Sequence, residues 1–237
     1  MAVSIRKPST FQQYLNLLGK DLRREFRTRE MLTAMGIYAF LVLVVYGAAL
    51  AQTANTFDIL QMSAGLLWAL IVFTSLLGLN RSFAHEQENG CLEGILLVPL
   101  DRSVVFLAKA TSNLLFLLAV EIIVLPLFYF FFLTTTTPAD TWPMLFLPLL
   151  VGTIGIAGIG TLLATITVNT RGKDVLLAVL FIPLIYPLLY ACVSATTVVI
   201  AGGDVESMFV PALALAGGYD VVMVLLSWVL YDFVISA

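Results

Sequence analysis

The residues best suited to recognition lie in one polar interval, residues 80–102, between two long apolar runs. This interval holds the only histidine, His85, and an Asn89-Gly90 pair that is typical of a turn. A helix of one or two turns with a small apolar patch can enter a groove on a partner protein, while Glu93 meets a basic residue of that partner. We therefore interpret the interval as a docking loop, and the alternative is a solvated connection. The apolar patch consists of Leu92, Ile95 and Leu96.

Two acidic residues lie within long apolar runs. Glu121 is well inside the third run, and Asp220 belongs to the sixth. A carboxylate inside a bilayer costs a few kcal/mol, so it faces other helices or water, or keeps its proton. Glu121 and Asp220 are therefore the candidates for an intramembrane proton or ion site, although Asp220 could instead lie near the membrane interface.

The motifs of several enzyme classes are missing. A phosphate-binding loop has the form GxxxxGK[ST], and the segment 171–173 (RGK) lacks its upstream glycine, so any ATP must be bound by another chain. One histidine, His85, cannot supply a bis-histidine haem site or a protease motif. Neither Cys91 nor Cys192 has a neighbour at metal-binding spacing. We expect no catalytic residue, no metal site, no bound cofactor and no nucleic-acid partner.

The composition predicts an integral membrane protein. Hydrophobic residues make up 60% of the 237 residues and charged residues 11%, against about 25% charged in soluble domains. Six runs are long enough to cross a bilayer as helices, and they are apolar on every face, unlike the alternating strands of a barrel. The predicted fold is all-α with six transmembrane helices. The runs are residues 31–51, 59–80, 104–133, 143–168, 175–201 and 210–234.

The basic residues predict the orientation, because short basic loops stay in the cytoplasm. All 12 Lys and Arg residues fall before the first run, around the docking loop, or between the fourth and fifth runs. The other three connections, near residues 52–58, 134–142 and 202–209, contain acids but no base. We expect a multi-pass membrane protein with both termini in the cytoplasm.

The N-terminal segment, residues 1–30, predicts an amphipathic helix that lies in the plane of the lipid headgroups. Apolar residues between Phe11 and Phe26 repeat at helical spacing, and four basic residues project from the opposite side. This helix either anchors the topology or braces the membrane domain, and the sequence favours neither. The remainder, residues 31–237, forms one transmembrane domain with a cytoplasmic coupling loop at 81–102.

Glycine and proline mark three further features. The fourth run carries a glycine stripe, Gly152, Gly155, Gly158 and Gly160, which favours close helix packing over contact with a substrate. Proline within a helix removes a hydrogen bond and favours a kink, which suggests either a moving element or a tolerated irregularity. A Gly217-Gly218 pair leaves open whether residues 202–220 form a re-entrant hairpin. The expected kinks are at Pro126, Pro183 and Pro187.

Two segments carry a resemblance to a known family. Residues 88–109 (ENGCLEGILLVPLDRSVVFLAK) and 170–189 (TRGKDVLLAVLFIPLIYPLL) resemble the haem exporter protein B family of bacterial cytochrome c maturation. Length, six runs and the basic amphipathic start match as well, so the resemblance covers essentially the whole chain. The chain departs from the family pattern at Asn89, where an acid is usual, and at Gly94, where Gln is expected.

The resemblance implies an ABC-2-type permease subunit, present in two copies, that works with a separate cytoplasmic ATPase. It further implies a haem-handling membrane subunit, a small single-span subunit and a periplasmic haem chaperone as partners, with haem as the candidate transported substrate. The ATPase-coupling residues that it assigns are Glu86, Asn89, Gly90, Leu92, Glu93, Ile95 and Leu96.

Several functions are compatible with the sequence alone. Within the family, the chain could convert ATP-driven closure of the ATPase into release of the haem-loaded chaperone, which we favour, or conduct haem itself. Outside it, the alternatives are an ABC-2 permease for another substrate, a proton-coupled transporter that uses Glu121, and a scaffold for the haem-handling subunit. Inverted repeats, which are common in secondary transporters, are not visible.

Overall fold

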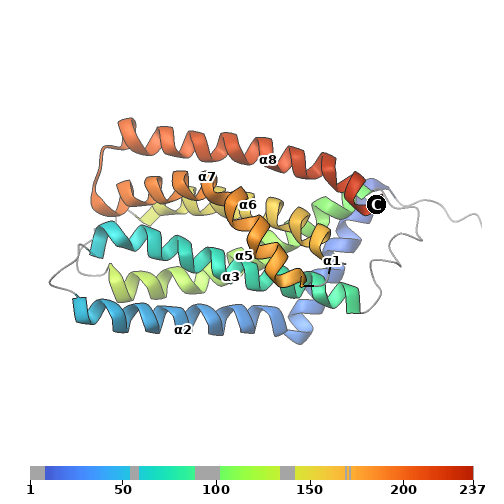
Figure 1. The fold of residues 1–237 in the computed structure, drawn as a ribbon, viewed down its shortest axis with the longest axis horizontal. Helices are drawn as coiled ribbons and strands as arrows, with labels where there is room; N and C mark the ends of the chain where they lie inside the picture. Colours follow the sequence, from blue (N-terminus) through green and yellow to red (C-terminus); the bar gives the residue numbers. More distant parts are fainter. Residues whose placement is uncertain are drawn as a thin grey trace, which may run out of the picture.

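The structure, a computed structural model, describes residues 9–53, 59–88, 102–133, 142–168, 170 and 172–236. The described part is almost entirely helical, and six of its helices are long and apolar enough to cross a membrane. An all-α membrane protein with six spans is therefore confirmed. Figure 1 shows these helices running side by side along the long axis of the molecule, with α1 across one end. The spans are α2 (Glu30–Thr53), α3 (Ile59–Glu88), α5 (Arg102–Phe132), α6 (Trp142–Thr167), α7 (Lys173–Ala201) and α8 (Val210–Ser236).

The predicted N-terminal helix is α1, Thr10–Thr28. Ser9 caps it by accepting a hydrogen bond from the Gln12 backbone N–H, and the Gln12 side chain bonds back to Ser9, which completes a capping box. The helix ends at Arg29, the only described non-glycine residue with a positive φ, 53°. This left-handed residue turns the chain directly into α2, so α1 lies across the bundle end.

Helix α6 forms the centre of the bundle. In its apolar segment 78% of the residues are buried, against 17% in that of α8, which lies at the periphery. The glycine stripe explains this close packing, because each glycine leaves room for a side chain of a neighbour. A Cβ added at Gly152 or Gly160 would overlap Trp68 or Leu79 of α3, and one at Gly158 would lie 2.8 Å from Val224 of α8.

One boundary differs from the sequence prediction, and one question that the sequence left open is answered. Helix α3 runs to Glu88. Residues 81–88, which we assigned to the coupling loop, are therefore a helical extension of the second span. Ala, Glu and Gln are good helix formers, and a helix that leaves the apolar layer needs no apolar residues to continue. The sequence left open whether residues 202–220 form a hairpin, and the structure shows none: after a short π-helix, η2 (Val205–Phe209), α8 runs unbroken through Gly217 and Gly218.

The three prolines at which we predicted kinks lie inside continuous helices, Pro126 in α5 and both Pro183 and Pro187 in α7. Neither helix is broken into two elements. Figure 1 shows that α7, drawn in orange, changes direction along its length. A bend in this helix agrees with the expectation for a span that lacks two backbone donors.

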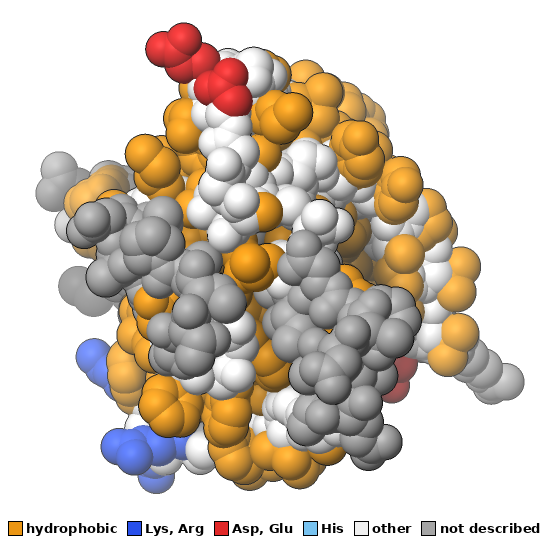
Figure 2. All heavy atoms as spheres, turned by 90° about the vertical axis from the view of Figure 1, so that its left-hand side faces the viewer, with side chains coloured by type: hydrophobic (Ala, Val, Ile, Leu, Met, Phe, Trp, Pro, Cys, Tyr) orange, Lys and Arg blue, Asp and Glu red, His pale blue; other side chains and the backbone are white. Residues whose placement is uncertain are grey.

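The two ends of the bundle differ in charge. The end that carries α1 also carries Arg81, Arg102 and Lys109, at or near the ends of α3 and α5. The opposite end, which faces the viewer in Figure 2, shows mainly apolar atoms, with acidic side chains at one edge. There Asp204 caps η2 and the exposed Glu206 follows it. The basic residues of the described chain thus gather at one end, as the orientation argument requires.

Candidate functional site

Two polar contacts join α5 to α6 inside the bundle. The Glu121 Oε1 atom lies 2.6 Å from the Thr153 hydroxyl, and the Asn113 amide donates to the Thr161 hydroxyl at 2.9 Å. All four side chains are buried. The second contact lies eight residues from the first on both helices, in opposite chain directions, which is about 12 Å along the helix axis. Both contacts therefore follow a single antiparallel register of α5 against α6. These contacts fix how α5 and α6 lie against each other.

Each threonine in this pair of contacts also bonds to its own helix. Thr153 donates to the Leu149 carbonyl at 2.8 Å, and Thr161 donates to the Ala157 carbonyl at 2.6 Å. This back-bonding is common for threonine in helices and leaves the hydroxyl oxygen as an acceptor for a neighbouring helix. Glu121, predicted as an intramembrane acid, therefore faces the bundle interior and not lipid.

Asp220 is the second predicted intramembrane acid, and it too is buried, with 6% of its surface exposed. Its carboxylate lies directly against Gly155 of α6, where a Cβ would overlap Oδ1 and would lie 2.5 Å from Leu188 of α7. The neighbouring Tyr219 hydroxyl donates to the Leu184 carbonyl of α7. Asp220 and Glu121 contact α6 one turn or less apart, at Gly155 and Thr153, but no direct contact joins the two acids in the described residues.

A third polar contact lies between α3 and α7, where Trp68 Nε1 donates to the Thr196 hydroxyl at 3.0 Å.

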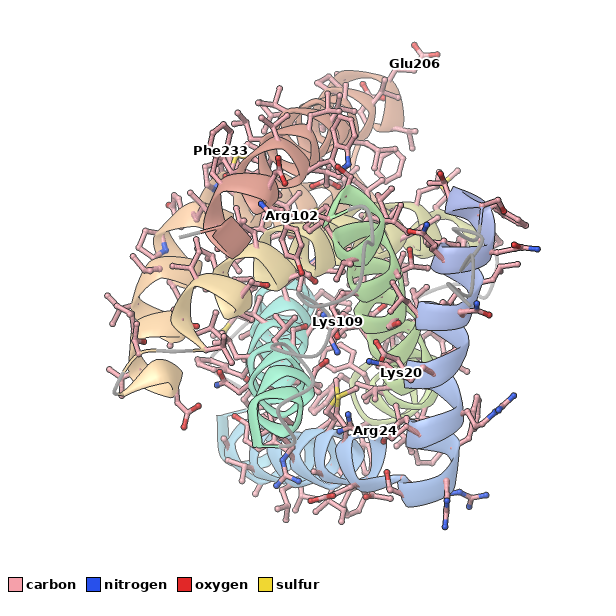
Figure 3. The ribbon with its side chains drawn as sticks, turned by 90° about the vertical axis from the view of Figure 1, so that its right-hand side faces the viewer. Lys20, Arg24, Arg102, Lys109, Glu206 and Phe233 are labelled. Atoms are coloured by element: carbon pink, nitrogen blue, oxygen red, sulfur yellow. The ribbon has the colours of Figure 1, made fainter. Side chains whose placement is uncertain are left out.

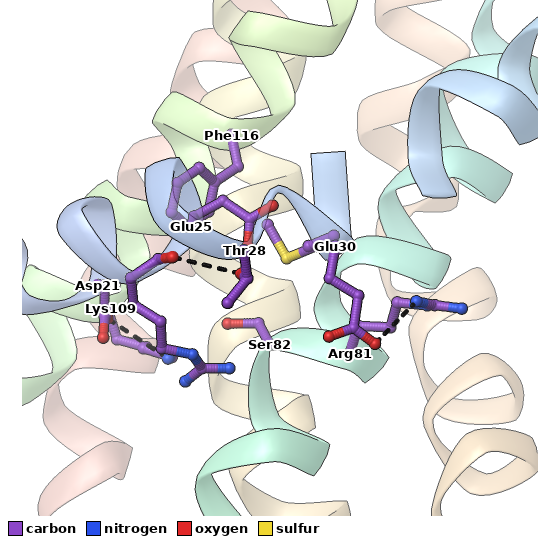
Figure 4. A pocket seen from close by; sticks show the side chains of 10 residues that line it. Asp21, Glu25, Thr28, Glu30, Arg81, Ser82, Lys109 and Phe116 are labelled. Atoms are coloured by element: carbon purple, nitrogen blue, oxygen red, sulfur yellow. Dashed lines mark hydrogen bonds and ion pairs between the residues drawn. The ribbon is translucent and has the colours of Figure 1, made fainter. Parts of the chain in front are cut away.

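A buried ion pair fastens α1 to the spans. Lys109 Nζ of α5 lies 3.4 Å from Asp21 Oδ2, and both side chains are less than 10% exposed. Lys20 lies 3.3 Å from the other oxygen of Asp21. Glu25 accepts a hydrogen bond from the Leu32 backbone N–H at 2.8 Å, which ties α1 to the first turn of α2. Figure 4 shows this junction from close by, and Figure 3 labels Lys20 and Lys109 at this end of the bundle.

Helix α1 consequently has three faces. Its apolar face points outward, with Phe11 and Phe26 each 68% exposed. Gln13, Asp21 and Glu25 are buried against the bundle. Between these two faces lie the exposed basic side chains. The sequence predicted the apolar and basic faces of α1 but not the polar face that packs against the bundle.

The predicted docking residues fall at the limit of the described chain. Glu86 belongs to the last turn of α3. The other six, Asn89, Gly90, Leu92, Glu93, Ile95 and Leu96, lie outside the described residues, so their docking role stays a prediction.

Sequence reasoning missed Asn113, Thr153, Thr161 and the pair of Lys109 with Asp21. A signal for the first three was a matching spacing of hydrogen-bonding residues in two apolar runs. Asn113 and Glu121 lie eight positions apart in the third run, and Thr153 and Thr161 lie eight positions apart in the fourth. A signal for Lys109 was a cation several residues inside the third run.

No group of three His, Cys, Asp or Glu side chains that could hold a metal is present in the described residues. The spans, the crossing amphipathic helix and the buried polar contacts define an all-α polytopic membrane protein. A sequence model of the family described as CcmB protein matches residues 12–233, which include the first five spans and nearly all of the sixth. The chain belongs to this family.

Curated relatives agree with the family match. The heme exporter protein B of Pseudomonas aeruginosa is 30% identical over 173 residues, which cover 73% of this chain and 75% of the relative. The heme exporter protein B of Rhodobacter capsulatus is 29% identical over 201 residues, 85% of this chain and 88% of the relative. That of Paracoccus denitrificans is 30% identical over 158 residues, 66% and 71% of the two chains.

Proposed function

We propose that this chain is the membrane-spanning permease subunit of a haem exporter that serves cytochrome c maturation. The observation that carries the proposal is the family match over residues 12–233, together with relatives named heme exporter protein B. The six spans agree with a permease, and the absence of a GxxxxGK[ST] loop agrees with a subunit that hydrolyses no ATP itself.

The energy source in this proposal is a separate cytoplasmic ATPase that docks on residues 86–97. Leu92, Ile95 and Leu96 enter a groove of the ATPase, and Glu93 meets a basic residue there. The extension of α3 to Glu88 supports this arrangement, because a rigid helix leads from the docking segment into the bundle. ATP-driven closure of the ATPase then moves α3, and the buried contacts between helices pass the movement on.

The proposed complex contains two copies of this chain, since six spans are half of the twelve usual for ABC-2-type transporters. Its other members are a haem-handling membrane subunit, a small single-span subunit and a periplasmic haem chaperone. The complex lies in the bacterial inner membrane with the α1 end in the cytoplasm, because that end carries the basic residues. We favour release of the haem-loaded chaperone as the driven step over passage of haem through this chain. This chain binds no resident cofactor in the proposal.

Co-purification tests the docking role. The chain is expressed with its ATPase partner, and Glu93→Lys is compared with the matched charge reversal Glu206→Lys at the opposite end of the bundle. We expect the Glu93 variant to insert into the membrane normally but to recover little ATPase, while the Glu206 variant recovers the normal amount. Equal recovery with both variants would contradict the docking role.

A further inference from the structure

A cavity of about 220 Å³ lies at the junction of α1 with the spans. It is lined from α1, α2, α3 and α5, and Figure 4 shows its side chains. A water takes up about 30 Å³ of liquid, so the cavity can hold a group of several non-hydrogen atoms, such as a phosphate. Most of its polar surface comes from side chains that carry charge or a hydroxyl group. These are Asp21, Arg24, Glu25, Thr28, Glu30, Arg81, Ser82 and Lys109.

The cations that line this cavity differ in whether an acid already pairs with them. Asp21 is shared by Lys109 and Lys20, at 3.4 and 3.3 Å, and Arg81 lies 3.8 Å from Glu30. Glu25 uses one oxygen to accept the Leu32 N–H. Three cations, Arg24, Arg81 and Lys109, and three acids, Asp21, Glu25 and Glu30, line the cavity, and Lys20 lies outside it. Arg24 has no ion-pair partner in the described residues, and Figure 3 shows it directed from α1 toward the middle of the bundle end.

The cavity lies at the level of the lipid headgroups. The apolar segment of α2 begins at Glu30 and that of α3 ends at Ser82, and both residues line the cavity. The buried side chains of Met31 and Phe116 form its apolar part. The outward apolar face of α1 rests on lipid if the helix lies in the headgroup plane, so the cavity beside it opens where phosphates are most abundant.

From this geometry we propose that the cavity binds the phosphodiester of an anionic phospholipid. Arg24 and Arg81 donate to the phosphate oxygens, and the Ser82 hydroxyl supplies a neutral donor. The bound lipid joins α1 to α2 and α3 next to the ion pair of Lys109 and Asp21. It stabilises the junction through which α1 braces the spans. This proposal does not depend on which substrate the protein exports.

Native mass spectrometry of the full chain, released from nanodiscs that contain phosphatidylglycerol, tests the proposal. Arg24→Gln is compared with Arg23→Gln, which removes the same charge from the adjacent, exposed position that does not line the cavity. We expect Arg24→Gln to reduce the retained phosphatidylglycerol about tenfold, and Arg23→Gln to leave it nearly unchanged. Arg24→Lys keeps the charge and should retain most of the lipid. Equal losses in both glutamine variants, or no loss in either, would overturn the proposal.

Two further measurements distinguish a lipid site from a folding defect and from a site for soluble phosphate. Circular dichroism and size-exclusion chromatography should show a normal fold for Arg24→Gln, because Arg24 makes no ion pair in the described chain. Millimolar inorganic phosphate is added to lipid-free protein in detergent, and its thermal stability is followed. We expect no stabilisation that depends on Arg24. Stabilisation equal to that by phosphatidylglycerol would assign the cavity to a soluble phosphate and overturn the lipid proposal.

Discussion

Glu121 and Thr153 meet between α5 and α6, with 2.6 Å between the carboxyl Oε1 and the hydroxyl oxygen. The same hydroxyl lies 2.8 Å from the Leu149 carbonyl. A threonine hydroxyl has a single proton to donate, so it cannot donate to both oxygens at once. Both contacts are full hydrogen bonds when Thr153 donates to the Leu149 carbonyl and a protonated Glu121 carboxyl donates to the Thr153 hydroxyl oxygen. The Asn113 contact with Thr161 is built in this way, with the amide as the donor.

Glutamine should replace Glu121 without loss, because its amide can donate to Thr153 as Asn113 donates to Thr161. We expect Glu121→Gln to keep haem-export activity and to change the free energy of unfolding by less than about 1 kcal/mol. Glu121→Ala should cost about 2–4 kcal/mol through the cavity that it leaves. Thermal unfolding in detergent and assembly of c-type cytochromes provide the measurements. A folded but inactive Glu121→Gln protein would favour the proton-coupled transporter instead.

The packing of Asp220 against Gly155 predicts a sharp response to one added methyl group. In Gly155→Ala the new Cβ overlaps the Asp220 carboxylate and approaches Leu188, so α8 or α7 must shift. Overpacking of this kind costs about 1–3 kcal/mol. The matched control is Gly217→Ala on α8, where a Cβ meets nothing within 4 Å. Thermal unfolding midpoints should fall only in the Gly155 variant, and equal midpoints would show that the contact is not tight.

Lys109 should hold α1 against the spans. Lys109→Met leaves Asp21 buried with Lys20 as its one remaining ion-pair partner among the described residues, and we expect a loss of about 2 kcal/mol, less than for a buried acid with no partner. Limited proteolysis with trypsin reports on the junction, because a detached α1 exposes its arginines to cleavage. The double variant Asp21→Asn with Lys109→Met should be cleaved more slowly than Lys109→Met alone. If Lys109→Met is cleaved at the rate of the unmodified chain, the ion pair does not fasten α1.

The sequence was sufficient for features that depend on composition and local periodicity. Six apolar runs predicted six spans, the periodicity between Phe11 and Phe26 predicted α1, and the glycine stripe predicted close packing of α6. Burial of Glu121 inside the bundle is one of the arrangements that the cost of a charge in lipid allowed.

Features that depend on long-range pairing could not be predicted. Thr153 as the partner of Glu121, and Asp21 as the partner of Lys109, are each set by how distant helices pack. The sequence could not decide whether residues 202–220 form a hairpin, because a Gly217-Gly218 pair is tolerated in a helix held by its neighbours, here through Tyr219 and Asp220. The end of α3 was misplaced because apolar content defines the bilayer crossing and not the helix.

Deletion of the gene for this chain in its source organism, with the unmodified chain supplied again from a plasmid, tests the central claim most directly. The readout is haem staining of c-type cytochromes beside spectroscopic measurement of b-type cytochromes, whose haem is not attached through the same system. We predict that the deletion abolishes c-type cytochromes, leaves b-type cytochromes unchanged, and is reversed by the plasmid. Normal amounts of c-type cytochromes in the deletion strain would contradict a role in haem export for cytochrome c maturation.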